Sequence, residues 1–273
     1  MLSLTAPTSQ DQGENNVGED DFYGCAFSSL ITSWRKVMQR EDAPFIFVQL
    51  PEYMNSCCLM PTCSPACPDD PVRARQLASF RDTQLAALAL PHTAVINTVD
   101  NGDPLGHDTS IHTLDKATVA RRMSLALRAL AFNESEVIYR APSYKHASAS
   151  TRGSLLLVTI TFNDVPASTG LRWVEPTLVG PHANSSLCPH QWGVPIEACA
   201  WFGIQDSAGE WHNATATIVG TDTLQLTAQA PIGRAAVATS NGYADWPVVN
   251  VYAGELPLLP WGPRNISQHL EGR

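Results

Sequence analysis

The fold is decided by an apolar stretch at residues 44–51, Pro-Phe-Ile-Phe-Val-Gln-Leu-Pro. Its apolar residues follow one another without alternating polar positions, which is typical of a strand buried on both faces of a parallel sheet. A proline at each end confines the predicted strand to residues 45–50. Residues 93–99, Thr-Ala-Val-Ile-Asn-Thr-Val, form a β-branched run that predicts a second strand.

Three segments around these strands have helical spacing. The first, residues 22–39, repeats apolar side chains at intervals of three and four, and the second and third cover residues 71–90 and 116–132. Helices that alternate with buried strands predict an α/β domain, in which helices cover a parallel sheet. The apolar positions expected on one face of the first helix are Phe22, Ala26, Leu30, Trp34 and Val37.

The pattern changes after Pro142. Short runs of alternating β-type residues follow, separated by Gly, Pro, Asn and Asp, and they predict an antiparallel, β-sandwich-like domain. We therefore expect two domains, residues 1–141 and residues 142–273. The clearest runs are residues 155–162, 214–219, 223–227 and 235–238.

The composition excludes two classes of partner. The 273 residues carry a net charge of −9, and the 17 Lys and Arg residues form no run, so electrostatic capture of nucleic acid is not expected. No stretch approaches the roughly 18 apolar residues of a membrane-spanning helix. A neutral or weakly polar small substrate fits this balance better.

Cysteines and glycosylation sequons both point to an oxidising compartment. A cluster of four cysteines among prolines favours disulfides; zinc is the alternative, although the spacing lacks paired Cys-x2-Cys knuckles. Cys25, in the first predicted helix, is expected to be a buried free thiol. We expect a secreted or lysosomal glycoprotein, although residues 1–10 do not resemble a signal peptide. The clustered cysteines are Cys57, Cys58, Cys63 and Cys67, the later pair is Cys188 and Cys199, and the sequons start at Asn133, Asn184, Asn213 and Asn265.

Residues 100–112 follow the second predicted strand and contain the first candidate site. Ligands bind at the carboxyl ends of strands in open α/β sheets, so a polar loop there is the natural place for chemistry. His112 could act as a general base, with Asp100, Asp103 or Asp108 as the carboxylate that orients it. The alternative is that the loop is only a turn and His112 only precedes a helix.

Two further polar clusters leave alternatives open. Gln12-Gly-Glu-Asn-Asn16 precedes the first helix and could supply either a helix cap or hydrogen-bond donors to an oxyanion. Arg81-Asp-Thr-Gln84 lies within a predicted helix, where such residues ordinarily form a solvated face.

These clusters, taken in order, resemble the sialate O-acetylesterases, a carbohydrate-esterase branch of the SGNH hydrolases. The resemblance covers about residues 11–262, except residues 53–70 and 167–200. It is carried by Gln12-Gly-Glu-Asn-Asn16, Tyr23-x-Cys25-x-Phe27, Pro44-Phe-x-Phe-Val-Gln-Leu50, Arg81-x-x-Gln84, Asp100-x-Gly-Asp-Pro with Ile111-His112-x-x-x-Lys116, Ala214-Thr-Ala-Thr-Ile-Val-Gly220 and Asn241-Gly-Tyr-Ala-Asp-Trp246.

The resemblance implies a cofactor-free and metal-free acetylesterase that acts on O-acetylated sialic acid or another acetylated glycan. It implies part of an SGNH three-layer α/β/α domain, followed by a β domain. His112 is then the catalytic base, oriented by Glu14, Asp103, Asp108 or a backbone carbonyl. The other residues carried over to the substrate side are Gln12, Gly13, Asn15, Asn16, Arg81 and Gln84.

The resemblance also implies a nucleophilic serine in a Gly-x-Ser block. No serine of this sequence lies in a matching context. We therefore expect a carboxy-terminal portion of an esterase that is inactive by itself.

A non-catalytic, secreted glycan-binding protein is the alternative function. Its β-rich half would stack tryptophans on sugar rings, although aromatic side chains in sheets are more often part of the core. The candidates are Trp192, Trp201, Trp211, Trp246 and Trp261.

Overall fold

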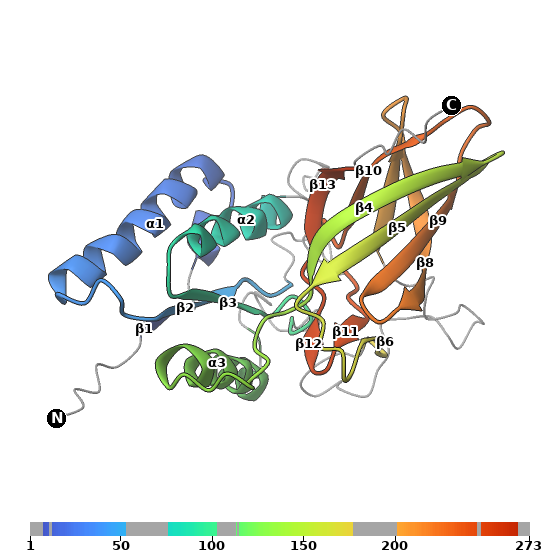
Figure 1. Cartoon of the computed structure of the whole chain (residues 1–273). Helices are drawn as coiled ribbons and strands as arrows, with labels where there is room; N and C mark the ends of the chain where they lie inside the picture. The colour runs from blue at the N-terminus through green and yellow to red at the C-terminus, as the bar shows by residue number, and fades with distance from the viewer. Residues whose placement is uncertain are drawn as a thin grey trace, which may run out of the picture. The chain divides into compact units, whose positions relative to one another are not determined.

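The computed structural model contains two compact units, Met1–Arg140 and Ala141–Arg273, which are described separately (Figure 1). None of the helices in the described part of the chain combines the length and hydropathy that crossing a bilayer requires. The residues that the structure describes are 8–10, 13–52, 76–102, 113, 115–176, 201–244 and 247–266.

A three-stranded parallel sheet forms the centre of the first unit. Its order is β1 (Thr8–Gln10), β2 (Phe45–Gln49) and β3 (Thr93–Asn97), with β2 in the middle. Phe45 of β2 lies opposite Thr93 of β3, and both strand pairs are parallel. All five residues of β2 are buried, so the expectation of a strand covered on both faces is confirmed.

Helices cover both faces of this sheet (Figure 1). On one face, Phe27 of α1 (Asp20–Val37) packs against Phe45 and Phe47, with ring centroids 5.9 and 5.2 Å apart. On the other face, Ile46 shares a core cluster with Ala126 of α3 (Lys116–Ala131). Successive strand residues point to opposite faces, and this alternation separates the two helices into different layers. The short η1 (Glu14–Asn16) precedes α1, and α2 (Gln76–Gln84) continues into η4 (Leu85–Ala89).

The face of α1 that packs inward differs from the expected one. The buried positions are Tyr23, Phe27, Ile31 and Arg35, whereas Phe22 is 67% exposed. Arg35 supports this orientation, because its Nε and Nη2 donate to the carbonyl oxygens of Ala43 and His92 just before β2 and β3. Both stripes of the helix are apolar, so spacing alone could not choose between them.

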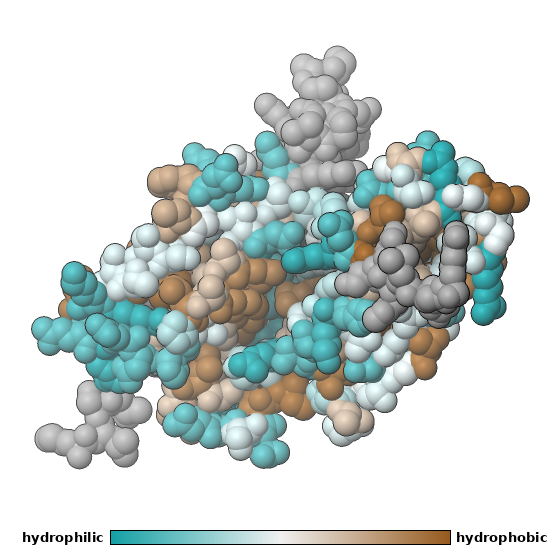
Figure 2. All heavy atoms as spheres, turned by 45° about the horizontal axis from the view of Figure 1, so that its top comes forward, coloured by the Kyte–Doolittle hydropathy of each residue, from teal (hydrophilic) through white to brown (hydrophobic). Residues whose placement is uncertain are grey.

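Apolar side chains also reach the surface. The expectation that Cys25 is buried is wrong: it is a free thiol on the exposed side of α1. Figure 2 shows hydrophobic residues among hydrophilic ones on the face drawn.

The second unit is built around an antiparallel sheet of seven strands. Their order is β13-β10-β7-β8-β9-β5-β4, and a separate antiparallel sheet has the order β12-β11-β6. The strands of the large sheet are β4 (Ser143–Arg152), β5 (Leu155–Asn163), β7 (Phe202–Asp206), β8 (Trp211–Gly220), β9 (Thr223–Gln229), β10 (Ala236–Asn241) and β13 (Trp261–Asn265), and those of the small sheet are β6 (Leu171–Trp173), β11 (Val251–Ala253) and β12 (Leu256–Pro257).

The large sheet curls around one core, so the β-sandwich-like expectation needs correction. Trp261 of β13 lies at one end of the strand order, yet its ring is 5.4 Å from that of Tyr144 on β4, at the other end. Phe162 and Phe202 contact the same indole from β5 and β7. These contacts bring the two ends of the sheet together around one hydrophobic core, which gives a nearly closed, barrel-like sheet. Trp261 is 2% exposed and therefore cannot stack on a sugar.

Trp261 should be a major source of stability for the second unit. We expect Trp261→Ala to lower the free energy of unfolding by about 3–5 kcal/mol, because it leaves a cavity among three aromatic rings. Trp201→Ala is the matched control, since that indole is 49% exposed and surface substitutions change stability little. Urea denaturation measures both effects, and similar losses in the two variants would contradict the assignment of Trp261 to the core.

Candidate active site

The candidate site lies at the carboxyl edge of the parallel sheet. Because the three strands are parallel, the residues that follow them meet at the same edge. Gly13 and η1 come after β1, residues 50–52 follow β2, and residues 98–102 follow β3. Most of the polar side chains discussed below belong to these segments or to the helices packed beside them.

Arg81 and Gln84 of α2 hold the end of β2 through its main chain. Arg81 donates from Nε to the Leu50 oxygen at 2.9 Å and from Nη2 to the Pro51 oxygen at 2.8 Å. The Gln84 amide donates to the Val48 oxygen at 3.1 Å and accepts from the Leu50 nitrogen at 3.0 Å. Both side chains are 1% exposed, so the solvated face expected of these two residues is wrong. Their contact with substrate stays a prediction, whereas their described contacts position the strand end.

Tyr23 connects the Gly13 segment to Gln84. Its ring lies 4.5 Å from that of Phe80. Gly13 lies against both, since a Cβ there would be 3.1 Å from the Tyr23 hydroxyl and from the Phe80 ring, and its φ of 132° also favours glycine. Burial raises the pKa of Tyr23 to about 12, opposed by a hydrogen bond with Gln84 and supported by the charge of Glu14. The motif around Gly13 and the motif that contains Gln84 therefore both contact the side chain of Tyr23.

The remainder of the Gln12–Asn16 cluster is less enclosed. Glu14 is half-buried, Asn15 is exposed, and the Asn16 amide donates to Glu19 at 3.1 Å. The nitrogen of Glu19 in turn donates to the Asn16 main-chain oxygen. Asn16 thus has contacts of the kind found before a helix, while any oxyanion role for this cluster remains a prediction.

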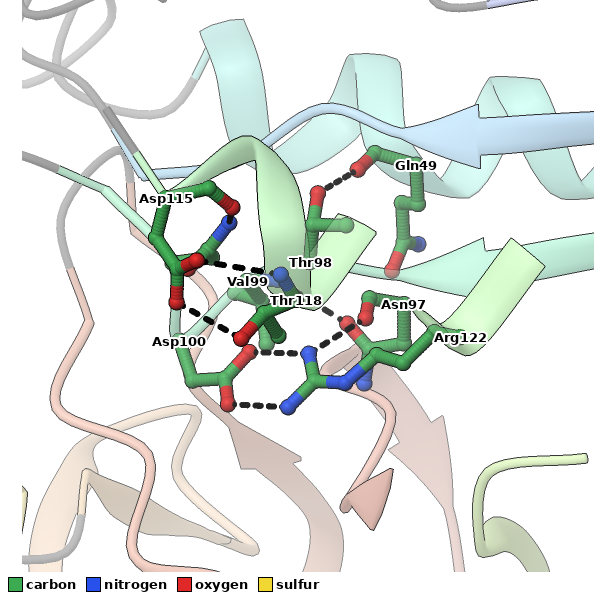
Figure 3. Close-up of polar contacts among 9 residues, drawn as sticks. Gln49, Asn97, Thr98, Val99, Asp100, Asp115, Thr118 and Arg122 are labelled. Atoms are coloured by element: carbon green, nitrogen blue, oxygen red, sulfur yellow. Dashed lines mark hydrogen bonds and ion pairs between the residues drawn. The ribbon is translucent and has the colours of Figure 1, made fainter. Parts of the chain in front are cut away.

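A buried ion pair fixes the end of β3 to α3 (Figure 3). The Asp100 carboxylate accepts from both terminal nitrogens of Arg122, each at 2.6 Å. The Arg122 side chain is 4% exposed and also donates to the Asn97 main-chain oxygen at 2.8 Å. The geometry is bidentate, which is the strong form of this interaction. Both carboxylate oxygens of Asp100 therefore bond to Arg122. This ion pair was not predicted from the sequence.

The segment that contains His112 is anchored at its two ends. Before it, the Asn101 amide donates to the Asp115 main-chain oxygen at 3.1 Å. After it, Thr113 is buried and its hydroxyl accepts from the Asp115 nitrogen. The Asp115 side chain caps α3 by accepting from the Thr118 nitrogen at 3.0 Å. Gln12, Asp103, Asp108 and His112 lie outside the described residues, as do all cysteines except Cys25, together with Asn184, Trp192 and Trp246.

Glu52 is a buried carboxyl group that sequence reasoning missed. It follows β2 directly after Pro51 and is only 3% exposed. Burial raises its pKa well above the usual range, the negative charge of Asp100 adds to this, and Arg81 opposes it. The sequence signal that could have indicated it is a charged residue shortly after a fully buried parallel strand. The raised pKa favours the protonated form of the Glu52 carboxyl group, and this form can donate a hydrogen bond.

One group of metal-ligand side chains occurs among the described residues. Asp206, Glu210 and His212 gather in the hairpin between β7 and β8. The Asp206 carboxylate accepts from the nitrogens of Ala208 and Glu210, and it pairs with His212 Nε2 at 3.0 Å. These hydrogen bonds stabilise the turn between β7 and β8, which explains why the three side chains lie close together.

Sequence comparison relates the chain to known esterases. The sialate O-acetylesterase of Rattus norvegicus is 33% identical over 157 residues, 54% of this chain, and that of Homo sapiens is 32% identical over 143 residues, 48% of this chain. The resemblance to the sialate O-acetylesterases is confirmed. The matches cover 27% and 25% of those proteins, so the chain spans about a quarter of the curated relatives. No family model matches the chain.

A solved structure shares the fold of this chain. A crystal structure of a carbohydrate acetylesterase from Xanthomonas citri has a TM-score of 0.67 and 24% sequence identity. The match covers 93% of this chain and 49% of that protein. Both units are therefore included in the shared fold.

The ion pair between Asp100 and Arg122 should be necessary for stability. We expect Arg122→Met to lower the free energy of unfolding by about 3–5 kcal/mol, because it leaves the Asp100 carboxylate, only 11% exposed, without its bidentate partner. Glu134→Gln is the control, since the Arg128–Glu134 pair is largely exposed and should contribute little. Urea denaturation compares the variants, and a loss below about 1 kcal/mol for Arg122→Met would contradict the buried pair.

Glu52 should make stability depend on pH. Its folded-state pKa is raised, so the folded protein holds a proton that the unfolded chain releases above about pH 4.3. The wild type therefore loses stability as the pH rises from there towards the folded-state pKa. Glu52→Gln stays neutral, so its urea midpoint relative to the wild type should rise between pH 5 and pH 8. The exposed Glu136→Gln variant should show no such trend, and a flat difference for Glu52→Gln would disprove the raised pKa.

Proposed function

We propose that this chain contributes part of the active site of a sialate O-acetylesterase-like enzyme, which releases acetate from O-acetylated sialic acid or a related sugar. The observation that carries the proposal is the 33% identity to the rat enzyme over 157 residues. The meeting of three matching motifs at one sheet edge supports it: Gly13 contacts Tyr23, and Gln84 and Arg81 hold the end of β2. The helices on both faces of the parallel sheet support our inference of an SGNH-type α/β/α domain for the first unit.

In the proposed reaction, a serine oxygen attacks the acetyl carbonyl and forms a tetrahedral oxyanion. His112 accepts the serine proton and passes it to the departing sugar oxygen, which leaves an acetyl-enzyme that water hydrolyses to acetate. We assign orientation of His112 to Glu14, Asp103 or Asp108, and oxyanion or substrate contacts to Gln12, Gly13, Asn15 and Asn16. No serine of this chain has the sequence context of the nucleophile, so we propose that the 273 residues alone do not turn over substrate.

We also propose that the chain enters the secretory pathway and reaches the extracellular space or the lysosome. The four sequons and the Pro-rich cysteine cluster support this proposal. A reducing compartment would not maintain disulfides among the clustered cysteines.

A glycan-binding protein without catalysis is a second candidate function. The observation in its favour is that Trp201 and Trp211 of the second unit are 49% and 38% exposed. Titration of the chain with a neutral acetylated glycan, followed by tryptophan fluorescence, separates the two functions. This alternative would be favoured if Trp201→Ala and Trp211→Ala abolish binding. It also requires that the chimera described in the next paragraph releases no acetate.

A chimera tests the esterase proposal. The segment of the rat enzyme that precedes the matched region is joined to this chain, and acetate release is measured from an aryl acetate and from O-acetylated sialic acid. We expect turnover by the chimera, a loss of about 10³-fold or more in kcat with His112→Ala, and little change with the exposed His146→Ala. No release is expected from the 273-residue chain alone.

Each result decides between the proposals. A folded chimera that releases no acetate, or one that is indifferent to His112→Ala, would overturn the esterase proposal. Turnover by the isolated chain that His112→Ala abolishes would support the esterase but disprove the inactivity of the chain by itself. Circular dichroism and a cooperative thermal transition show whether the chimera is folded.

A further inference from the structure

One glycosylation sequon lies beside an exposed tryptophan on the outer face of the second unit. Residues 211–215 are Trp-His-Asn-Ala-Thr, so Asn213 and Thr215 form a sequon. Alternate residues of a strand share a face, and Trp211, Asn213 and Thr215 are all exposed along β8. Asn213 is the acceptor of the only sequon in the sequence that ends in threonine.

Gly203 allows the indole to lie next to Asn213. The strand register places Gly203 of β7 directly opposite Asn213. A Cβ on Gly203 would be 3.1 Å from Cε3 of Trp211 and 2.9 Å from the hydroxyl of Ser240. The indole therefore lies over the glycine, on the neighbouring strand and beside the Asn213 side chain. It is 38% exposed, so part of its apolar ring stays uncovered by protein.

We propose that Asn213 carries an N-linked oligosaccharide whose first N-acetylglucosamine covers the Trp211 ring. The oligosaccharide comes from a lipid pyrophosphate donor. The Asn213 Nδ2 bonds to C1 of the sugar, the bond from C1 to the phosphate oxygen breaks, and the lipid pyrophosphate leaves while the amide loses one proton. The C–H face of a pyranose is apolar, and the indole provides a flat apolar partner of similar size. The proposal requires entry into the secretory pathway.

Asn265 is a comparison within the same unit. It is also an exposed strand residue in a sequon, but the residue two positions earlier is Pro263 and not an aromatic residue. A glycan at Asn265 therefore has no ring at the corresponding place. Any effect that depends on Trp211 should be found at Asn213 and not at Asn265.

The experiment places a secretion signal before the 273-residue chain and expresses it in mammalian cells. Glycopeptide mass spectrometry measures occupancy at each sequon, and thermal unfolding measures stability. We expect Asn213 to be occupied and Asn213→Gln to lower Tm by about 2–4 °C. In the Trp211→Ala background the same Asn213→Gln change should leave Tm unaltered, while in the control Trp201→Ala background the loss should persist.

Two further measurements keep the proposal falsifiable if Trp211→Ala folds poorly. Trp211→Phe retains an aromatic ring and should keep part of the stabilisation by the glycan. Gly203→Ala displaces the indole and should therefore abolish that stabilisation. The acetyl methyl proton of the first sugar at Asn213 should show an upfield NMR shift from the ring current, which Gly203→Ala abolishes. An unoccupied Asn213 in the secreted chain, or a Tm loss equal in all backgrounds, would overturn the proposal.

Discussion

The buried main chain at the end of β2 is the constraint on which the first unit depends. A polar backbone group that leaves water must find a partner inside the protein. Arg81 and Gln84 supply these partners for Val48, Leu50 and Pro51 from a helix about 30 residues later in the chain. Because Gln84 also reaches Tyr23, the same helix determines where the Gly13 segment lies. The hydrogen bonds of α2 thus connect the end of β2 to the segment that follows β1.

Much of the secondary structure could be predicted from the sequence, because it depends on local patterns. The two strands at residues 45–50 and 93–99 stand out as apolar or β-branched runs, and the structure contains strands at both. The orientation of α1 could not be predicted, since Phe22 and Tyr23 begin two apolar stripes of similar quality. Contacts with distant residues select one of them: Arg35 bonds to the carbonyl oxygens just before β2 and β3, and Phe27 packs against the rings of β2. The curling of the large sheet likewise depends on a contact between its ends.

The roles of polar residues were harder to predict than the motifs themselves. The order of the motifs was sufficient for the family resemblance, but spacing does not show which partner a side chain will find. Asp100 belongs to the same cluster as Asp103 and Asp108, yet it is engaged by Arg122. Arg81 resembles a surface residue in its helix and is almost fully buried. The raised pKa of Glu52 could not be predicted, because it depends on burial and on Asp100 and Arg81, which are distant in sequence.

The hydrogen bond between Asn101 and Asp115 has a consequence for chain length. It joins the residues on either side of the segment that carries His112 and, together with the Asp100–Arg122 ion pair, it ties the end of β3 to α3. Once loop ends are fixed, doubling the length between them costs only about 0.6 kcal/mol in closure entropy. A longer connection between Asn101 and Asp115 is therefore compatible with the same contact between the end of β3 and the start of α3.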